Sequence, residues 1–359
     1  MPKVVRVALV LWILCFTSSC GILPLNPKYQ SPPQRPPNFE QYYAHPPYTS
    51  FREEAIRDKV HFAVKRIFVE TPTGEIKIDY YYKPERNKDL VFVFPLLGGK
   101  NHIADYFAEY FVRHGFDSAV VHRNNDFKNP VFFDKIEEVL RENVVRDRVA
   151  IDFFEKEYGK AAFGSFGISR GAINVATTAG VDPRLKYNVM ALGGTDMVDI
   201  FKHSNQKRLK FYRNAVMQSK GITKEDFYKL LRQTVKTAPE HMARYIDAKQ
   251  TLLLLSAFDR TVPFKFGMRL REQIGEPKTV VMAADHYTSI LYTQYVSLAP
   301  PFRAIGVFPF DYIESEALGF YRQSFGVKTP TLKLLPFRLL QIPFSLIAQT
   351  TAKFSRQGK

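Results

Sequence analysis

The sequence predicts an α/β fold in which helices flank a mostly parallel central sheet. First, short and almost wholly apolar segments recur along the chain, for example residues 89–94 (DLVFVF) and 251–258 (TLLLLSAF). Strands that are apolar on both faces are typical of parallel sheets covered by helices on both sides. Second, these segments alternate with longer segments of helical periodicity. Third, 359 residues, of which 45% are apolar, are enough for a substantial core.

The predicted elements follow one another in a regular order. Residues 64–70 and 75–82 flank the turn sequence TPTG and predict a hairpin. Strands and helices then alternate as far as the last predicted strand. The predicted strands are residues 89–94, 117–122, 161–166, 187–192, 251–258 and 279–283, and the predicted helices are residues 104–114, 133–158, 172–179 and 262–274.

Residues 195–250 interrupt this alternation. The segment is charged, helical in pattern and free of strand-like runs, and it lies just before the strand at 251–258. Helices inserted between two parallel strands can form a lid over an active site. They can equally pack on a face of the sheet, and the sequence leaves both alternatives open.

The N-terminal residues have the composition of an export signal. Lys3 and Arg6 precede the apolar run 7–16, and the small polar residues 17–19 then lead to Cys20. About ten apolar residues are sufficient for the core of a signal peptide and too few to cross a bilayer. This arrangement resembles the signal of a bacterial lipoprotein, with a departure at position 17, where threonine stands in place of the usual leucine.

The resemblance implies that residues 1–19 are a cleaved signal peptide and that Cys20 becomes a lipidated first residue. The protein would then be anchored to a membrane of a bacterial cell envelope, and Gly21 resembles the residue found in lipoproteins sent to the outer membrane. An ordinary cleaved signal and an uncleaved anchor are the alternatives. With Cys15 removed and Cys20 modified, the mature chain would carry no free thiol.

The remaining organisation is predicted from composition. Proline-rich residues 20–55 predict an extended, lipid-anchored tether that holds the folded body away from a surface. Residues 56–300 form the predicted main domain. Residues 301–359 are an aromatic and basic extension, in which 333–352 is apolar enough either to dock on the body, the interpretation we prefer, or to lie on a membrane.

A serine with glycine two residues away on both sides lies in the middle of the chain. Residues 167–171 read GISRG and match the pattern G-x-S-x-G around Ser169. A chance match is expected in about one chain in ten of this length. The context strengthens the match, because an apolar strand enters it and a helix of small residues leaves it. Ser165 lies inside the strand and is the wrong candidate, and a loop with incidental glycines is the plainer alternative.

A base and an acid follow at the ends of later strands. A serine hydroxyl needs both, the base to accept its proton and the acid to orient the base. His286 directly follows the last predicted strand, and Asp259 follows the strand at 251–258. The carboxyl ends of parallel strands meet at one edge of a sheet. Asp196 and Asp199 are the rival candidates for the acid, and Asp259 could also cap a helix. The other histidines fit no such position, and we expect His61, His102 and His122 to be structural.

The order Ser169, Asp259, His286 is that of the α/β-hydrolase superfamily, and residues 60–300 resemble its serine esterases and lipases. The resemblance implies that Ser169 is the nucleophile, His286 the general base and Asp259 the acid that orients it. It also implies two backbone donors for the oxyanion. One is the amide of Arg170. The other lies in the loop Pro95-Leu96-Leu97-Gly98-Gly99, where this chain departs from the usual His-Gly pair; Leu97 is the first choice and Leu96 the second.

The family's chemistry implies an exported serine hydrolase that cleaves small carboxylic esters or related acyl bonds through an acyl-enzyme. Thioesterase and peptidase activities remain open, as does a non-catalytic envelope lipoprotein that binds lipid, glycan or protein. The sequence predicts no cofactor and no metal, since it lacks H-E-x-x-H, paired C-x-x-C and dinucleotide-binding patterns. Its net charge of +16 is scattered, so we expect no nucleic-acid partner, and the excess fits an anionic membrane surface better.

Overall fold

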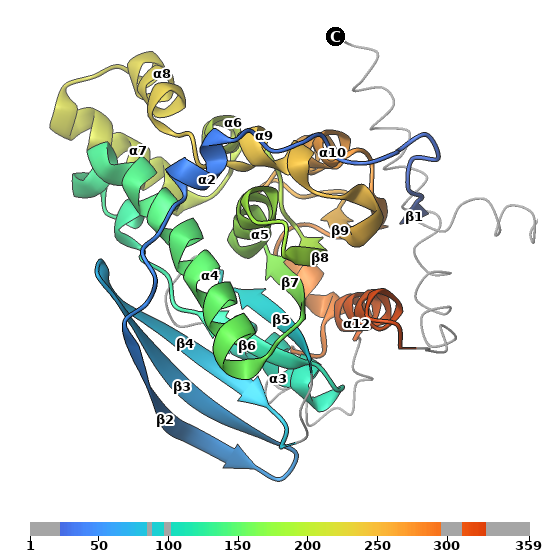
Figure 1. The fold of residues 1–359 in the computed structure, drawn as a ribbon. Helices are drawn as coiled ribbons and strands as arrows, with labels where there is room; N and C mark the ends of the chain where they lie inside the picture. The colour runs from blue at the N-terminus through green and yellow to red at the C-terminus, as the bar shows by residue number, and fades with distance from the viewer. Residues whose placement is uncertain (1–21, 85–87, 97–101, 296–310, 328–359) are drawn as a thin grey trace, which may run out of the picture.

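The chain folds around one sheet with the strand order β1-β10-β9-β8-β7-β5-β6-β4-β3-β2 (Figure 1). This computed structural model describes residues 22–84, 88–96, 102–295 and 311–327. The strands from β10 to β6 run parallel to their neighbours, and the pairs at the two ends of the sheet are antiparallel. The predicted α/β class with a mostly parallel sheet is therefore confirmed.

Most elements lie within a few residues of their predicted positions. The strands are β1 (Ile22–Leu23), β2 (Ser50–Lys59), β3 (Phe62–Thr71), β4 (Gly74–Tyr82), β5 (Asp89–Phe94), β6 (Asp117–Val121), β7 (Ala162–Ile168), β8 (Leu185–Ala191), β9 (Thr251–Ser256) and β10 (Lys278–Met282). The α-helices are α2 (Asn38–Tyr42), α3 (His102–Arg113), α4 (Ile136–Tyr158), α5 (Arg170–Val181), α6 (Met197–His203), α7 (Lys207–Lys220), α8 (Lys224–Thr234), α9 (Pro239–Met242), α10 (Phe264–Ile274) and α12 (Tyr312–Ser324). Short 3₁₀ turns include η2 (Pro130–Lys135) and η5 (Thr288–Tyr292).

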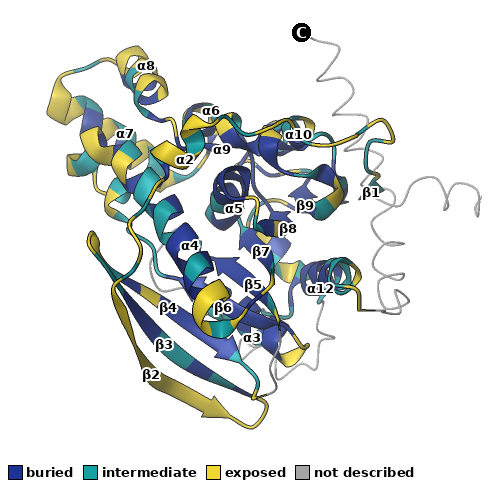
Figure 2. Ribbon diagram, in the orientation of Figure 1, coloured by how far each residue is buried: buried dark blue, intermediate teal, exposed yellow. Residues whose placement is uncertain are grey.

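A separate hydrophobic core covers each face of the sheet. Helices α4, α5 and α10 pack on one face, and α3 and α12 pack on the other. The central strands are mostly buried, as Figure 2 shows, and every residue of β9 is buried. Burial on both faces explains why these strands are continuous apolar runs instead of alternating patterns.

Helix α12 lies beyond residue 300, the predicted end of the main domain, and packs on the folded body. Tyr321 of this helix is fully buried, and its hydroxyl donates to the carbonyl of Ser165 in β7 at 2.6 Å. Residues 312–324 of the predicted extension thus supply one of the two helices on that face of the sheet. Residues 328–359, with the apolar segment 333–352, lie outside the described residues.

The proline-rich N-terminal segment lies against the body and does not form a free tether. β1 pairs with the edge strand β10, and Tyr43 is fully buried. Arg35 donates from Nε to the carbonyl of Gly180 at 2.8 Å, in the last turn of α5. The last carbonyls of a helix have no partner within it and attract cations. The prolines disfavour regular secondary structure in this segment. The segment still binds the domain, because its arginine and tyrosine side chains contact the body.

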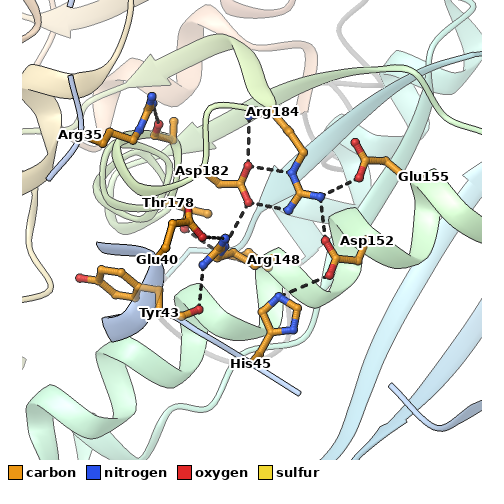
Figure 3. Close-up of polar contacts among 12 residues, drawn as sticks. Arg35, Glu40, Tyr43, His45, Arg148, Asp152, Glu155, Thr178, Asp182 and Arg184 are labelled. Carbon is orange, nitrogen blue, oxygen red and sulfur yellow. Dashed lines mark hydrogen bonds and ion pairs between the residues drawn. The ribbon is translucent and has the colours of Figure 1, made fainter. Parts of the chain in front are cut away.

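Arg148 of α4 forms hydrogen bonds with the same N-terminal segment (Figure 3). Its guanidinium donates to the carbonyl of Tyr43 at 2.9 Å and to the carboxylate of Glu40 at 2.6 Å. Its Nε donates to Asp182 at 3.2 Å, and Asp182 also accepts from Arg184. Two arginines and two carboxylates thus join the N-terminal segment to α4 and to the loop after α5.

Strand β2 begins at Ser50, inside the segment predicted as a tether, and forms one edge of the sheet. All of its residues are exposed (Figure 2), and six of the ten carry a charge. Charged residues on an edge strand oppose pairing with another chain. This strand was not predicted because exposure on both faces removes the alternating apolar pattern by which strands are recognised.

The insertion at 195–250 forms helices α6 to α9, of which α7 and α8 extend away from the sheet (Figure 1). Residues of α6, α7 and α8 share a hydrophobic cluster with η2 and the start of α4, and this cluster contains no strand residue. The alternative that these helices pack on a sheet face therefore does not describe α7 and α8. Within the described ranges, no helix combines the length and apolar character needed to cross a membrane.

Candidate active site

Ser169 stands at a sharp turn between β7 and α5. Its backbone has φ 56° and ψ −119°, in the left-handed half of conformational space, and its amide donates to the carbonyl of Ala191 at 2.8 Å. A non-glycine residue held in such a conformation costs about 1–3 kcal/mol. The turn is therefore maintained by the strands on either side of β7 and by α5, and not by local preference.

The two glycines of G-x-S-x-G are required by close backbone approaches. A Cβ on Gly167 would lie 2.4 Å from the carbonyl oxygen of Gly171, and one on Gly171 would lie 2.4 Å from the carbonyl oxygen of Phe94. Both distances are far inside van der Waals contact. The motif thus lets α5 start directly against the end of β7 and the end of β5.

We expect Gly171→Ala to destabilise the protein by about 3 kcal/mol or more, because the added methyl group must push α5 away from β5. The matched control is Gly319→Ala in α12, where a Cβ meets nothing within 4 Å. There the substitution removes a helix-interior glycine and should stabilise the protein by up to about 1 kcal/mol. Chemical denaturation measures both changes, and equal stabilities of the two variants would contradict the close approach.

The structure brings Ser169, His286 and Asp259 together. Ser169 Oγ lies 2.9 Å from His286 Nε2, and His286 Nδ1 lies 2.7 Å from Asp259 Oδ2. A carboxylate only accepts hydrogen bonds, so Nδ1 carries the proton in this contact. In the neutral ring Nε2 is then the acceptor and faces the serine hydroxyl. The histidine is thus held in the tautomer that can accept a proton from Ser169.

Asp259 is fixed by the backbone that follows it. Its second oxygen, Oδ1, accepts from the amides of Thr261 at 2.8 Å and Val262 at 2.9 Å. The side chain is only 3% exposed, and that of His286 is 9% exposed, so little water competes for their contact. The carboxylate caps the turn before α10, while its other oxygen remains for the histidine.

The loop that presents His286 is closed by its neighbour Asp285. The Asp285 carboxylate accepts from the amides of Tyr287 at 2.8 Å and Thr288 at 2.9 Å, and these contacts hold its pKa below the ordinary value. Ser289 Oγ reaches both Ser256 of β9, at 2.6 Å, and the Asp285 carbonyl. Asp285 therefore orders the turn that carries His286.

The rival acids are occupied elsewhere. Asp196 accepts from Arg269, and Asp199 lies 3.0 Å from Arg232. Ser165 is buried and donates to Asn188 at 2.6 Å, as expected for a serine inside a strand.

The histidines expected to be structural lie away from this site. His122 contacts Asp79 at 2.8 Å, in a network completed by Arg66. His61 and His102 are exposed.

The predicted oxyanion donors are only partly described. Arg170 is the first residue of α5, and the first backbone amides of a helix have no partner within it. Leu96 lines the same cavity as Ser169. Leu97, the first choice for the second donor, and Cys20, the predicted lipidation site, lie outside the described residues.

Ser169 lies on the walls of two cavities. The larger, about 230 Å³, is mostly apolar and is shared with His286. The smaller, about 90 Å³, extends toward the insertion. Gln206, just before α7, lines both cavities and was missed by sequence reasoning; the position of the insertion before β9 was its only indication. The other residues of the larger cavity include Ile103, Phe107, Ile168, Leu192, Tyr287, Ile290 and Ile313.

A buried carboxyl group lies behind the larger cavity. Glu314 of α12 has no exposed surface, and its Oε1 accepts from the Tyr106 hydroxyl at 2.6 Å and the Gln294 amide at 2.8 Å. Burial disfavours its charged form and raises its pKa to about 8. The group joins α3, α12 and the loop after His286.

This carboxyl group should make stability depend on pH. The folded protein holds a proton on Glu314 up to about pH 8, while the unfolded chain releases it near the ordinary value of 4.5. The free energy of unfolding should therefore fall by a few kcal/mol as the pH rises from about 4.5 to 8. Glu314→Gln keeps an oxygen that can accept from the Tyr106 hydroxyl and the Gln294 amide, but it cannot ionise. The free energy of unfolding of this variant should therefore depend less on pH. Denaturant titrations from pH 5 to 8.5 measure the difference, and parallel curves for the two proteins would contradict the prediction.

The fold was also compared with known proteins. No family model and no curated protein matches the sequence. Among solved structures, acetyl xylan esterase 1 from Thermoanaerobacterium sp. is 11% identical, with 83% of this chain and 100% of that chain covered and a TM-score of 0.56. Acetyl xylan esterase from Paenibacillus sp. is 15% identical (77% and 92% covered, TM-score 0.54), and carboxyl esterase 2 from Tuber melanosporum is 17% identical (80% and 94% covered, TM-score 0.50). Together with the sheet order and the turn at Ser169, these likenesses show that the chain has the fold of the α/β-hydrolase superfamily.

Proposed function

We propose that the protein is a serine hydrolase that cleaves carboxylic esters. The observation that carries the proposal is the hydrogen-bonded series Ser169, His286 and Asp259 at the wall of an apolar cavity. A nucleophile, a base and an orienting acid in these contacts are the arrangement that acyl transfer requires. The esterase activities in the names of the similar structures agree with this reaction class.

In the proposed reaction each of these groups has one role. Ser169 Oγ attacks the carbonyl carbon of the ester while its proton passes to His286 Nε2. The bond to the leaving alcohol then breaks, the alcohol takes this proton, and the acyl group remains on Ser169. Water attacks the acyl-enzyme, again giving its proton to His286, and the acid leaves as Ser169 recovers its own. Asp259 balances the positive charge that develops on the His286 imidazole during both acylation and deacylation.

The oxyanion of each tetrahedral intermediate needs backbone donors. The Arg170 amide, at the start of α5, is the first, and the positive end of the helix adds to it. The second comes from the loop after β5, and Leu96 at the cavity wall is its described part. The larger cavity suits a short acyl chain or a small alcohol, since an apolar wall favours uncharged groups.

A fluorophosphonate probe tests this proposal. The folded protein should be labelled at Ser169, located by mass spectrometry of the labelled peptide, and should release 4-nitrophenol from 4-nitrophenyl butyrate. Ser165→Ala is the matched control and should still be labelled. Absence of both labelling and ester hydrolysis, with an active hydrolase run in parallel, would favour a non-catalytic lipoprotein that uses the cavity for binding. Thioesters and peptides tested in the same assay decide between the remaining acyl substrates.

We also propose that the mature protein is anchored through a lipid on Cys20 to a membrane of the bacterial cell envelope. The charged, apolar and small-residue order of residues 1–20 supports this. We expect the wild-type protein to partition into a detergent phase and the Cys20→Ser variant to remain in the aqueous phase. Partition of Cys20→Ser into the detergent phase to the same extent would contradict the lipid.

A further inference from the structure

The smaller cavity beside Ser169 contains a positive charge that forms no ion pair with any residue that the structure describes. The Arg170 side chain lines this cavity, together with Phe127, Met197, Gln206 and apolar residues of α4 and α5, and no carboxylate lines it. Within the described residues, Arg170 forms no ion pair. The polar partner that it has is Met197 Sδ, 3.3 Å from Nη1.

The surroundings of Arg170 are unfavourable for a lone cation. Its Nε is buried without a hydrogen-bond partner among the described residues. A cation–π contact with Phe127, 4.9 Å from the guanidinium to the ring centre, offsets part of this cost but supplies no negative charge. Burial and the neighbouring Arg123 lower its pKa to about 10, so it is still charged at neutral pH. Glu240 is the nearby carboxylate, and its charge opposes this lowering of the pKa. It accepts from the Met197 amide at 3.1 Å and forms no hydrogen bond or ion pair with Arg170.

A half-buried guanidinium that forms no ion pair has donors left for a ligand, and planar carboxylates match those donors best. We propose that the smaller cavity binds a carboxylate substituent of the substrate, held by Arg170, so that the enzyme prefers esters that carry a negative charge. This inference rests on the proposed ester hydrolysis at Ser169. Arg170 thereby acts twice, through its backbone amide on the oxyanion and through its side chain on specificity.

The size and charge of the cavity define the substituent. A volume of about 90 Å³, less than half that of the apolar cavity, favours a short acid. One guanidinium balances one negative charge, which favours a carboxylate over a phosphate dianion. Because Ser169 lies on the walls of both cavities, the reacting carbonyl can sit between the charged group and the apolar cavity.

Matched esters test the preference. Mono-4-nitrophenyl glutarate is compared with 4-nitrophenyl butyrate for a charge in the acyl part, and 3-acetoxypropanoate with propyl acetate for a charge in the alcohol part. In one of the two pairs, the wild type should show a kcat/KM about 10- to 100-fold higher for the charged ester, as expected for a hydrogen bond between charged groups. No preference in either pair would overturn the proposal.

Three variants assign the preference to Arg170. Arg170→Met keeps an unbranched side chain against Phe127 and keeps the backbone amide. It should lose the preference, measured as the ratio of kcat/KM for the charged ester to kcat/KM for the neutral ester. Arg170→Lys should restore part of it, since the charge remains but the fork of donors is lost. Arg208→Met removes an exposed charge of α7 that does not line the cavity, and it should keep the preference. Equal losses in Arg208→Met and Arg170→Met would show a general effect of charge and overturn the subsite.

Calorimetry separates this inference from the proposed function. Ser169→Ala should bind at least one of the two charged esters, mono-4-nitrophenyl glutarate or 3-acetoxypropanoate, at least tenfold more tightly than Ser169→Ala/Arg170→Met does. If no ester is cleaved by any variant, the proposed function fails and the calorimetric comparison alone decides the subsite. If neutral esters are cleaved but Arg170 changes neither rate nor binding of the charged one, the hydrolase stands and the subsite fails.

Discussion

Ser169→Ala is expected to lower kcat for 4-nitrophenyl butyrate by about 10⁵- to 10⁶-fold, the loss seen when a triad nucleophile is removed. The reason is that no other hydroxyl of the described residues faces His286 Nε2, which contacts Ser169 Oγ at 2.9 Å. Residual turnover should come from binding and the oxyanion donors alone. Steady-state rates with purified protein measure the change, and KM should move much less than kcat.

Ser165→Ala is the matched control because it removes a serine of the same stretch. Ser165 is fully buried and bonded to Asn188, so its loss should reduce stability and leave kcat within a few-fold of the wild type. The melting temperature distinguishes the two effects. A rate in Ser169→Ala above one hundredth of the wild type would mean that another group carries the reaction.

Asp259→Asn should lower kcat by roughly 10⁴-fold with little change of fold. The amide retains an oxygen for the amides of Thr261 and Val262, but its NH₂ group would face His286 Nδ1. A donor in that place favours the other tautomer, in which Nε2 carries the proton and cannot accept one from Ser169. The predicted defect therefore concerns the proton and not the position of the ring.

Asp196→Asn is the control for this prediction, because Asp196 is the acid that the sequence offered as a rival. Its carboxylate pairs with Arg269, outside the hydrogen-bonded series. We expect a kcat within about threefold of the wild type and a small loss of stability. The same assay measures both variants over pH 6 to 9. A larger defect in Asp196→Asn than in Asp259→Asn would transfer the acid's role and refute the assignment.

The strand and helix pattern could be predicted from the sequence because each central element is encoded by residues close together in the chain. Each buried strand, such as β9, is a short apolar run, and each covering helix shows its own periodicity. The placement of Ser169, Asp259 and His286 could be anticipated because all three follow such strands. The carboxyl ends of parallel strands meet, whatever the intervening segments do.

Other features depended on contacts between distant residues. The proline-rich segment looked like a tether because its own sequence forms no core, yet Arg35 finds helix carbonyls 145 residues away. Helix α12 was missed because its buried face mixes glutamate and tyrosine with aliphatic residues, and Glu314 is paired with Tyr106 across 208 positions. Polar residues that are satisfied only by remote partners give no apolar pattern to detect.

The sequence by itself determined the α/β class, the sharp turn at Ser169 and the order of its three reactive groups. These follow from short-range rules: apolar runs form buried strands, and only glycine fits where backbones pass at 2.4 Å from a Cβ. The tertiary structure alone decided that Asp259 and not Asp196 meets His286, and that Arg170 lies in a cavity where it forms no ion pair with a described residue. Those outcomes depend on distances between elements far apart in the chain, which local preferences do not encode.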